Sequence, residues 1–284
     1  MSTVAQTATL PARRSPIGSL GPLATLARRR FALTARTPRE LIVPLVNPVL
    51  FAVVIAPALK EALGTFRPDV DYQAFVAVAT VGLLIPLNTM FSGIGVIVDR
   101  DTGARRELLA APIPRALVVL GNLVVAFAIT ALQVGVLMAA SVLRGTDFHT
   151  DASGILWFLG AAALFTVGMY GVAETLANRM PKQEEYIGFV PAIAILPWFF
   201  AGSLFPIAVL PGFLHAVAKV FPLTHALAVM RYGLGVDPRG TGLHEIWGLN
   251  DPTTMAALSL GVVALFAVAF TAISIRVFTR SALR

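Results

Sequence analysis

Long apolar stretches alternate with short charged segments along most of the chain. Each stretch is close to or above the roughly 20 residues that a helix needs to cross about 30 Å of hydrocarbon. A helix satisfies its own backbone hydrogen bonds, so such stretches can lie in lipid. We therefore predict an all-α integral membrane protein with six transmembrane helices. The predicted spans cover residues 41–59, 72–98, 116–143, 152–175, 186–209 and 254–276.

The segment between the fifth and sixth spans has a different pattern. Residues 211–235 are apolar but interrupted by Lys219, Pro222 and Arg231, and neither half is long enough to span. We expect two short helices, over residues 212–220 and 223–233, that lie at or re-enter the outer, extracytoplasmic interface.

The chain before the first span divides into two parts. Residues 1–22 are rich in Ser, Thr, Pro and Ala, which predicts a disordered tail, and residues 23–284 form one transmembrane domain. From residue 23, apolar positions recur at helical spacing, which predicts a cytoplasmic amphipathic helix at the membrane interface. The alternative is a solvated leader with incidental arginines. The interface residues predicted for this helix are Arg28, Arg29, Phe31 and Arg36.

Composition narrows the class of protein. Hydrophobic residues make up 57% of the 284 residues and charged residues 13%, and the mean hydropathy is +0.79. A soluble domain of this length needs more polar surface, so membrane is the expected solvent. The net charge of +7 follows from arginine-rich loops that face anionic lipid, and nucleic acid is not an expected partner.

The positions of Arg and Lys predict the orientation. Most of the 22 basic residues fall in the N-terminal segment, the second and fourth inter-span loops and the C-terminal end. Short loops rich in these residues stay in the cytoplasm, so both termini are predicted to be cytoplasmic. The excess of Arg over Lys, with abundant Ala and Gly, favours a bacterial cytoplasmic membrane.

Several kinds of chemistry are absent from the sequence. A Walker A loop needs lysine after glycine, and none of Lys60, Lys182 and Lys219 follows one. We therefore expect no bound nucleotide, no cofactor and no catalytic residue. His244 and Glu245 lack a second histidine at position 248, and the four histidines show no metal-ligand spacing, so no metal site is predicted.

Glu174 is a carboxylate inside the fourth predicted span. An intramembrane carboxylate is a candidate functional residue. Its position near the cytoplasmic end of the span favours a side chain that extends to water there.

Three stretches resemble the permease subunits of ABC type-2 exporters, which include drug, natural-product and polysaccharide exporters. RTPRELIVPLVNPVLFAVV (36–54) is similar to the family's entry into its first span. VDRDTGARRELLAAPIPRALVVLGN (98–122) is similar to its acidic-basic-acidic cytoplasmic loop, with aspartates where glutamates are common. LFPIAVLPGFLHAVAKVFPLTHALAVMRYGLG (204–235) is similar to its Phe-Pro, Leu-Pro and Pro-Leu-Thr signature.

The resemblance implies that residues 99–115 contain a coupling helix that docks on a separate ATPase subunit. Independently, Glu107, Leu108 and Leu109 form a short amphipathic turn between Gly103 and Pro112. The alternative is an ordinary positively charged cytoplasmic loop. The predicted coupling residues are Asp99, Arg100, Asp101, Arg105, Arg106, Glu107, Leu108, Leu109, Pro112 and Arg115.

The partners implied by the resemblance are two copies of the ATPase subunit, which bind ATP and Mg, and a second permease copy or a sister permease. Membrane lipids are further partners. The expected function is ATP-driven export of a hydrophobic or amphipathic compound, because the spans carry aromatic residues and few charges. An ion-gradient-driven transporter and a membrane-embedded enzyme are the alternatives. The candidate substrate path consists of Asn88, Phe91, Gln133, Tyr170, Trp198, Phe199 and Phe200.

Overall fold

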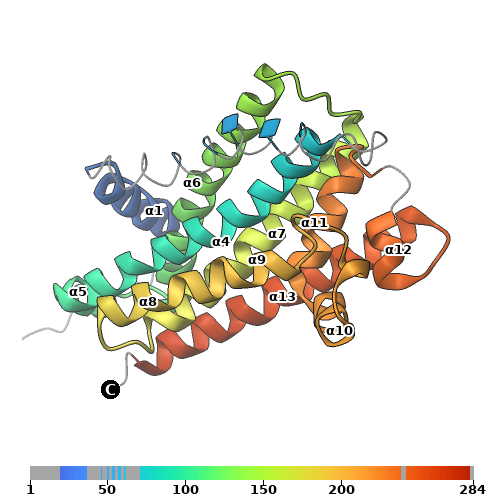
Figure 1. Cartoon of the computed structure of the whole chain (residues 1–284). Coiled ribbons are helices and arrows are strands. Elements are labelled where there is room, and N and C mark those ends of the chain that lie inside the picture. Colours follow the sequence, from blue (N-terminus) through green and yellow to red (C-terminus); the bar gives the residue numbers. More distant parts are fainter. Residues whose placement is uncertain are drawn as a thin grey trace, which may run out of the picture.

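The computed structural model describes residues 20–36, 71–237 and 241–281, together with residues 46, 50, 53, 54, 57, 58 and 61. Every regular element in this part of the chain is a helix (Figure 1). Residues 1–19 of the predicted tail, and most of the first predicted span, lie outside the described residues. The elements are α1 (Leu20–Ala35), α4 (Tyr72–Asp101), α5 (Ala104–Ala110), α6 (Arg115–Leu143), α7 (Ala152–Ala177), α8 (Gln183–Ala194), α9 (Leu196–Phe200), the 3-10 turn η2 (Ile207–Val209), α10 (Gly212–Val220), α11 (Pro222–Gly233), α12 (Thr241–Trp247) and α13 (Pro252–Ser281).

Four of these helices, α4, α6, α7 and α13, are long and apolar enough to cross a membrane. They correspond to the second, third, fourth and sixth predicted spans. The short helices α10 and α11 also match their predicted ranges, and they meet at an angle of 73°. The described part of the chain therefore holds four candidate spans, or five if the bent pair counts as one, and the count of six stays a prediction.

The fifth predicted span is broken. Instead of one helix over residues 186–209, α8 ends at Ala194, α9 ends at Phe200 and only the turn η2 follows. Proline has no N–H to donate along a helix, and Pro191 and Pro197 both fall in this segment. The backbone N–H of Trp198 donates to the carbonyl of Ile195 at 3.1 Å, so the chain makes a tight turn at the start of α9. The apolar composition was predicted correctly, but a continuous helix was not found.

The core forms around α7, which packs against α4, α11 and α13. Glycines on α7 permit the closest of these contacts. A Cβ on Gly171 would lie 2.6 Å from the carbonyl carbon of Phe270 on α13, and a Cβ on Gly168 would overlap the ring of Phe266. The outer faces of α6 and α13 are apolar and exposed, as expected for lipid-facing helices.

The long helices α4, α7 and α13 run in the same direction, and α6 runs in the opposite direction (Figure 1). At one end of the bundle, α5, the α7–α8 turn and the last residues of α13 meet, and we call this the basic end. At the other end, α4, α7 and α13 begin with Asp71, Asp151 and Asp251 immediately before them, and we call this the acidic end.

Candidate functional site

The helix α5 lies at the basic end as a separate short turn between α4 and α6. Gly103, with φ of +81°, allows the chain to leave α4 and start α5 in a new direction. The ten predicted coupling residues divide by exposure. Asp101, Arg106, Glu107 and Pro112 are exposed, whereas Asp99, Arg100, Arg105, Leu108, Leu109 and Arg115 are buried or half-buried.

The inner face of α5 attaches it to the bundle. Leu108 and Leu109 are half-buried in a cluster with Val118 of α6 and Phe278 of α13. They therefore belong to the support of α5, and its exposed residues are Arg106, Glu107 and Ala110.

Arg105 was expected beside the exposed turn, but the structure buries it against α13. Its guanidinium lies 4.8 Å from the ring centroid of Phe278, donates to the Phe278 carbonyl at 3.5 Å and contacts Ser281 Oγ. Burial lowers the pKa of Arg105 below its usual value. Arg115 donates to the nearby Thr279 carbonyl at 3.2 Å. The two arginines tie the α5 region to the C-terminal end of α13.

Arg100 ties the end of α4 to the end of α7. It donates to the carbonyls of Met180 at 2.7 Å, Pro181 at 2.9 Å and Ala177 at 3.4 Å. Helix C-termini leave carbonyls without internal partners, and a cation there is favourable. Arg100 therefore holds the α7–α8 turn.

Arg30 joins α1 to α4. Its guanidinium pairs with Asp99 at 3.2 Å and donates to the Gly95 carbonyl at 3.2 Å and the Ser92 carbonyl at 3.4 Å. A Cβ on Gly95 would overlap this guanidinium, so glycine provides the space that Arg30 occupies. Arg29 also pairs with Asp99, at 3.3 Å, but its side chain is 36% exposed against 13% for Arg30.

Arg30 was absent from the residues predicted for the interface helix. The signal was present, because position 30 lies on the same helical face as Leu23, Leu26, Ala27 and Thr34. That face packs against α6 and α4, with Leu26 so close to α6 that a Cβ on Gly121 would lie 2.8 Å from Leu26 Cβ.

The opposite face of α1 is free of the bundle in the described part of the chain. Arg28, Phe31 and Arg36 are exposed, and Phe31 is 55% exposed. Phe31 is one of the residues predicted for the membrane interface, and its side chain is not covered by α6. An exposed aromatic residue between arginines is the pattern of a helix that lies on a membrane surface.

Glu174 does not extend to water, and that expectation was wrong. Its side chain is fully buried and accepts hydrogen bonds from Tyr170 Oη at 2.6 Å and Asn178 Nδ2 at 3.0 Å. Tyr170 lies four residues before Glu174 on α7, and Asn178, the C-cap residue of α7, lies four residues after it, so both hydrogen bonds come from the same side of the helix. The carboxylate is satisfied locally.

The predicted substrate-path residues are not gathered in one place. Asn88 donates to Gln133 in a buried bond between α4 and α6, and Trp198 Nε1 donates to the Ala79 carbonyl at 2.7 Å. Tyr170 Oη donates a hydrogen bond to the Glu174 carboxylate. The remaining three are Phe91 and Phe199, which are exposed, and Phe200, which packs edge-to-face on Phe221.

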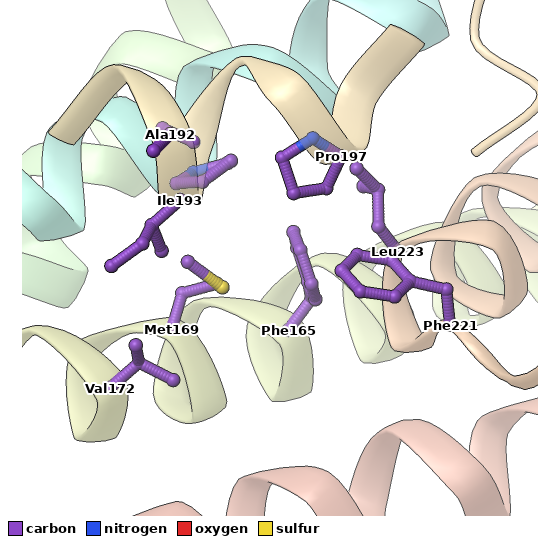
Figure 2. A pocket seen from close by; sticks show the side chains of 10 residues that line it. Phe165, Met169, Val172, Ala192, Ile193, Pro197, Phe221 and Leu223 are labelled. Carbon is purple, nitrogen blue, oxygen red and sulfur yellow. The ribbon is translucent and has the colours of Figure 1, made fainter. Parts of the chain in front are cut away.

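A separate cavity of about 270 Å³ lies between α7 and the broken pair α8–α9. Figure 2 shows Phe165, Met169 and Val172 rising from α7 on one side, with Ile193 and Pro197 facing them. The ten residues that line it are all apolar. They are Pro86, Phe165, Met169, Val172, Ala192, Ile193, Ala194, Pro197, Phe221 and Leu223.

Comparison with known proteins identifies relatives. A sequence model described as ABC-2 type transporter matches residues 22–234. A transport permease named ycf38 from Pyropia yezoensis is 24% identical over 201 residues, which are 69% of this chain and 68% of that protein. A doxorubicin resistance ABC transporter permease protein, DrrC, of Mycobacterium tuberculosis is 24% identical over 189 residues, 66% of this chain and 67% of that one. Nodulation protein J of Neorhizobium galegae is 23% identical over 256 residues, 89% of this chain and 90% of that one.

Proposed function

The chain belongs to the ABC-2 type transporter family and is a multi-pass membrane transport permease, and we propose that it is the permease subunit of an ATP-driven exporter. In this proposal a separate ATPase subunit, present in two copies, binds ATP and Mg. Two permease subunits, identical or sister chains, enclose the transport path in a bacterial cytoplasmic membrane.

The observation that carries the proposal is the construction of the basic end. Arg106 and Glu107 of α5 are exposed to solvent. The inner face of α5 is fixed to the bundle by Arg105, Leu108 and Leu109. A docking surface must be both exposed and rigidly supported if a partner's motion is to move the bundle. This turn has both properties.

The basic end is assigned to the cytoplasm, with both termini on that side. Arg100, Arg105, Arg106 and Arg115 gather there with α1, and arginine-rich loops remain cytoplasmic. The exposed face of α1, with Arg28 and Phe31, then lies on the anionic inner surface of the membrane.

Coupling follows from the contacts between helices at this end. When nucleotide binding closes the two ATPase subunits, α5 and α1 move with them. Arg105 and Arg115 pass the movement to α13, Arg100 passes it to α7, and Arg30 passes it to α4. Nucleotide state thereby favours one of two packings of the bundle.

The cargo is a hydrophobic or amphipathic compound. The long helices carry few charges, and the inner carboxylate Glu174 is already satisfied by Tyr170 and Asn178. A relative whose name connects it with doxorubicin resistance is consistent with cargo of this class.

The test is a charge reversal on the exposed face of α5. The double variant Arg106→Glu and Glu107→Lys changes no buried contact, and Leu108 is left intact because it supports α5. We expect the amount of co-purified ATPase to fall about tenfold, a change of about 1.4 kcal/mol in binding, and export to fall with it. Glu184→Lys, an exposed change at the same end, is the matched control.

Three outcomes would contradict the proposal. Unchanged ATPase binding and export in the charge-reversed variant would remove α5 from the docking surface. Transport that persists without any ATPase but stops when the proton gradient is collapsed would favour an ion-driven transporter, and metal-dependent turnover by the purified chain would favour an enzyme.

A further inference from the structure

The apolar cavity between α7 and α8–α9 arises where two helices break. Pro191 and Pro197 interrupt the fifth apolar stretch, and the bend between α10 and α11 falls at Phe221 and Pro222. Broken helices cannot pack side by side along their full length, so a cavity remains between them and the straight face of α7. We call this cavity the slot. Phe165, Met169 and Val172 form that face.

The slot is elongated along α7. Phe165 and Val172 are seven residues apart on one helical face, and at a rise of 1.5 Å per residue this separation is about 10 Å. The α7 wall of the cavity therefore runs along a long helix, and lipid chains in a bilayer lie along the same general direction. A volume of about 270 Å³ spread over that length is narrow, and it suits one flexible chain.

Water is a poor occupant. A buried water needs two to four polar partners, and none of the ten lining residues has a polar side chain. Apolar cavities of about 150 Å³ are known to stay dry and to bind small apolar molecules. This one is larger, and empty space of that size leaves its lining without contacts.

The surroundings of the slot are apolar as well. Ala192 is exposed at its rim, and Phe189, Leu196 and Phe199 on the same segment are about half exposed. A molecule that reaches the slot past these residues crosses an apolar surface. Met169, which is unbranched and adaptable, lies across from Ile193 and can adjust to a chain between them.

We propose that this slot is a binding site for one acyl chain of a membrane lipid, which fills the gap left by the break between α8 and α9. The headgroup stays outside, because the slot offers it no polar partner. The site is distinct from the docking surface on α5 and does not depend on that assignment.

The test uses photolabelling of the purified transporter in phosphatidylcholine vesicles. A phosphatidylcholine that carries a diazirine on one acyl chain is activated, and labelled residues are mapped by mass spectrometry. We expect Phe165, Met169 and Ile193 to be labelled more strongly than the exposed residues of α6 and α13. Ala192→Phe fills the rim of the slot and should reduce labelling of these residues about tenfold, because a packed interior leaves no room for both groups.

Gly188→Phe is the matched control. It lies one turn before Ala192 on α8, and a Cβ there meets nothing within 4 Å. Labelling of the slot should persist in this variant, which shows that a bulky residue on α8 does not disturb the fold. Thermal unfolding of both variants, compared with the wild type, verifies that each is folded.

Three outcomes would overturn the inference. Labelling spread evenly over all lipid-facing helices would show that the slot has no preference for a chain. Full labelling of the slot in Ala192→Phe would place the acyl chain elsewhere. Cross-linking from a photoreactive residue at position 192 to a second copy of this chain would show that protein, and not lipid, fills the slot.

Discussion

At both ends of the bundle, charged side chains form hydrogen bonds with backbone groups of the helices, with carboxylates at one end and guanidinium groups at the other. At the acidic end, Asp71, Asp151 and Asp251 accept hydrogen bonds from the first free N–H groups of α4, α7 and α13. At the basic end, Arg100 and Arg105 donate to carbonyls at the ends of α7 and α13, and Arg30 donates to a carbonyl within α4. Both arrangements satisfy helix termini and complement the helix dipole.

The difference lies in the reach of the contacts. Each aspartate caps the helix that it precedes, within three residues. Each arginine binds a different element: Arg30 of α1 binds α4, Arg100 of α4 binds the end of α7, and Arg105 and Arg115 bind α13. The three aspartates at the acidic end are independent caps, whereas the arginines at the basic end form a cross-linked network. A push on α5 is therefore shared by several helices.

Arg231 lies at the acidic end but, unlike these aspartates, binds distant residues, and it gives the largest expected effect. Arg231 is buried, donates to the carbonyls of Gly202 at 2.7 Å and Ser203 at 2.9 Å, and lies 3.7 Å from the ring centroid of Phe75. Arg231→Leu leaves both carbonyls without these partners, so we expect a loss of about 3 to 5 kcal/mol in the free energy of unfolding.

Thermal unfolding of the purified protein measures this loss. Arg231→Lys should fall between the variant and the wild type, because lysine keeps the charge but lacks the planar fork that reaches both carbonyls. Arg144→Ala is the control, because Arg144 at the same end is exposed and its bond to the Val53 carbonyl, at 3.0 Å, is exposed as well. Wild-type stability in Arg231→Leu would show that the acidic end needs no long-range contact.

A smaller effect is expected where α1 meets α4. Gly95→Ala places a methyl group where the Arg30 guanidinium lies, so it should displace Arg30 and cost about 1 to 3 kcal/mol. In an Arg30→Ala background the same change should be nearly neutral. The double-mutant cycle is measured by unfolding, and equal costs in both backgrounds would mean that Arg30 does not occupy this space in the protein.

Arg29→Ala compares the exposed partner of Asp99 with the more buried partner, Arg30. It removes the other pairing to Asp99 from a side chain that is 36% exposed. Solvent weakens such a pair, and we expect a change of about 0 to 1 kcal/mol. A larger loss than for Arg30→Ala would reverse the order of the two arginines.

The smallest effect concerns pH and the independent caps. Hydrogen bonds from Thr254 lower the pKa of Asp251 below its ordinary value of 3.8. The folded state then binds the proton less tightly than the unfolded state, so the contribution of the cap is fully present above the unfolded pKa and is lost as the pH falls through the folded pKa.

Amide hydrogen exchange at Thr253 and Thr254 follows this cap. Exchange should accelerate as the pH falls below about 4 in the wild type, relative to the intrinsic rate. Asp251→Asn should keep the cap without the acid sensitivity, because asparagine caps helices as well as aspartate. Identical pH profiles in the two proteins would contradict the role of the carboxylate.

The sequence was sufficient for the parts of the fold that depend on continuous apolar runs. α4, α6, α7 and α13 were predicted because lipid requires such runs, and the bend between α10 and α11 was marked by Pro222. The break between α8 and α9 was missed because prolines alone do not show whether a helix kinks or ends. Tertiary packing decides between the two.

The candidate site was predicted by location but not by contact. The distribution of arginines indicated one end of the molecule, yet which arginine is buried depends on partners distant in sequence, such as Phe278 for Arg105. Arg30 could have been selected from its place on the apolar face of α1. The substrate path stays a prediction, because a buried polar residue such as Asn88 has the same sequence pattern whether it binds cargo or Gln133.

The central claim is that α5 at the basic end faces the cytoplasm and docks an ATPase. The chain has no cysteine, so E107C and D147C variants each offer one thiol at an exposed position, one at each end. With a membrane-impermeant maleimide on intact cells, we predict labelling of D147C alone, labelling of E107C only after permeabilisation, and protection of E107C when the ATPase is bound. Labelling of E107C from outside intact cells would contradict the account.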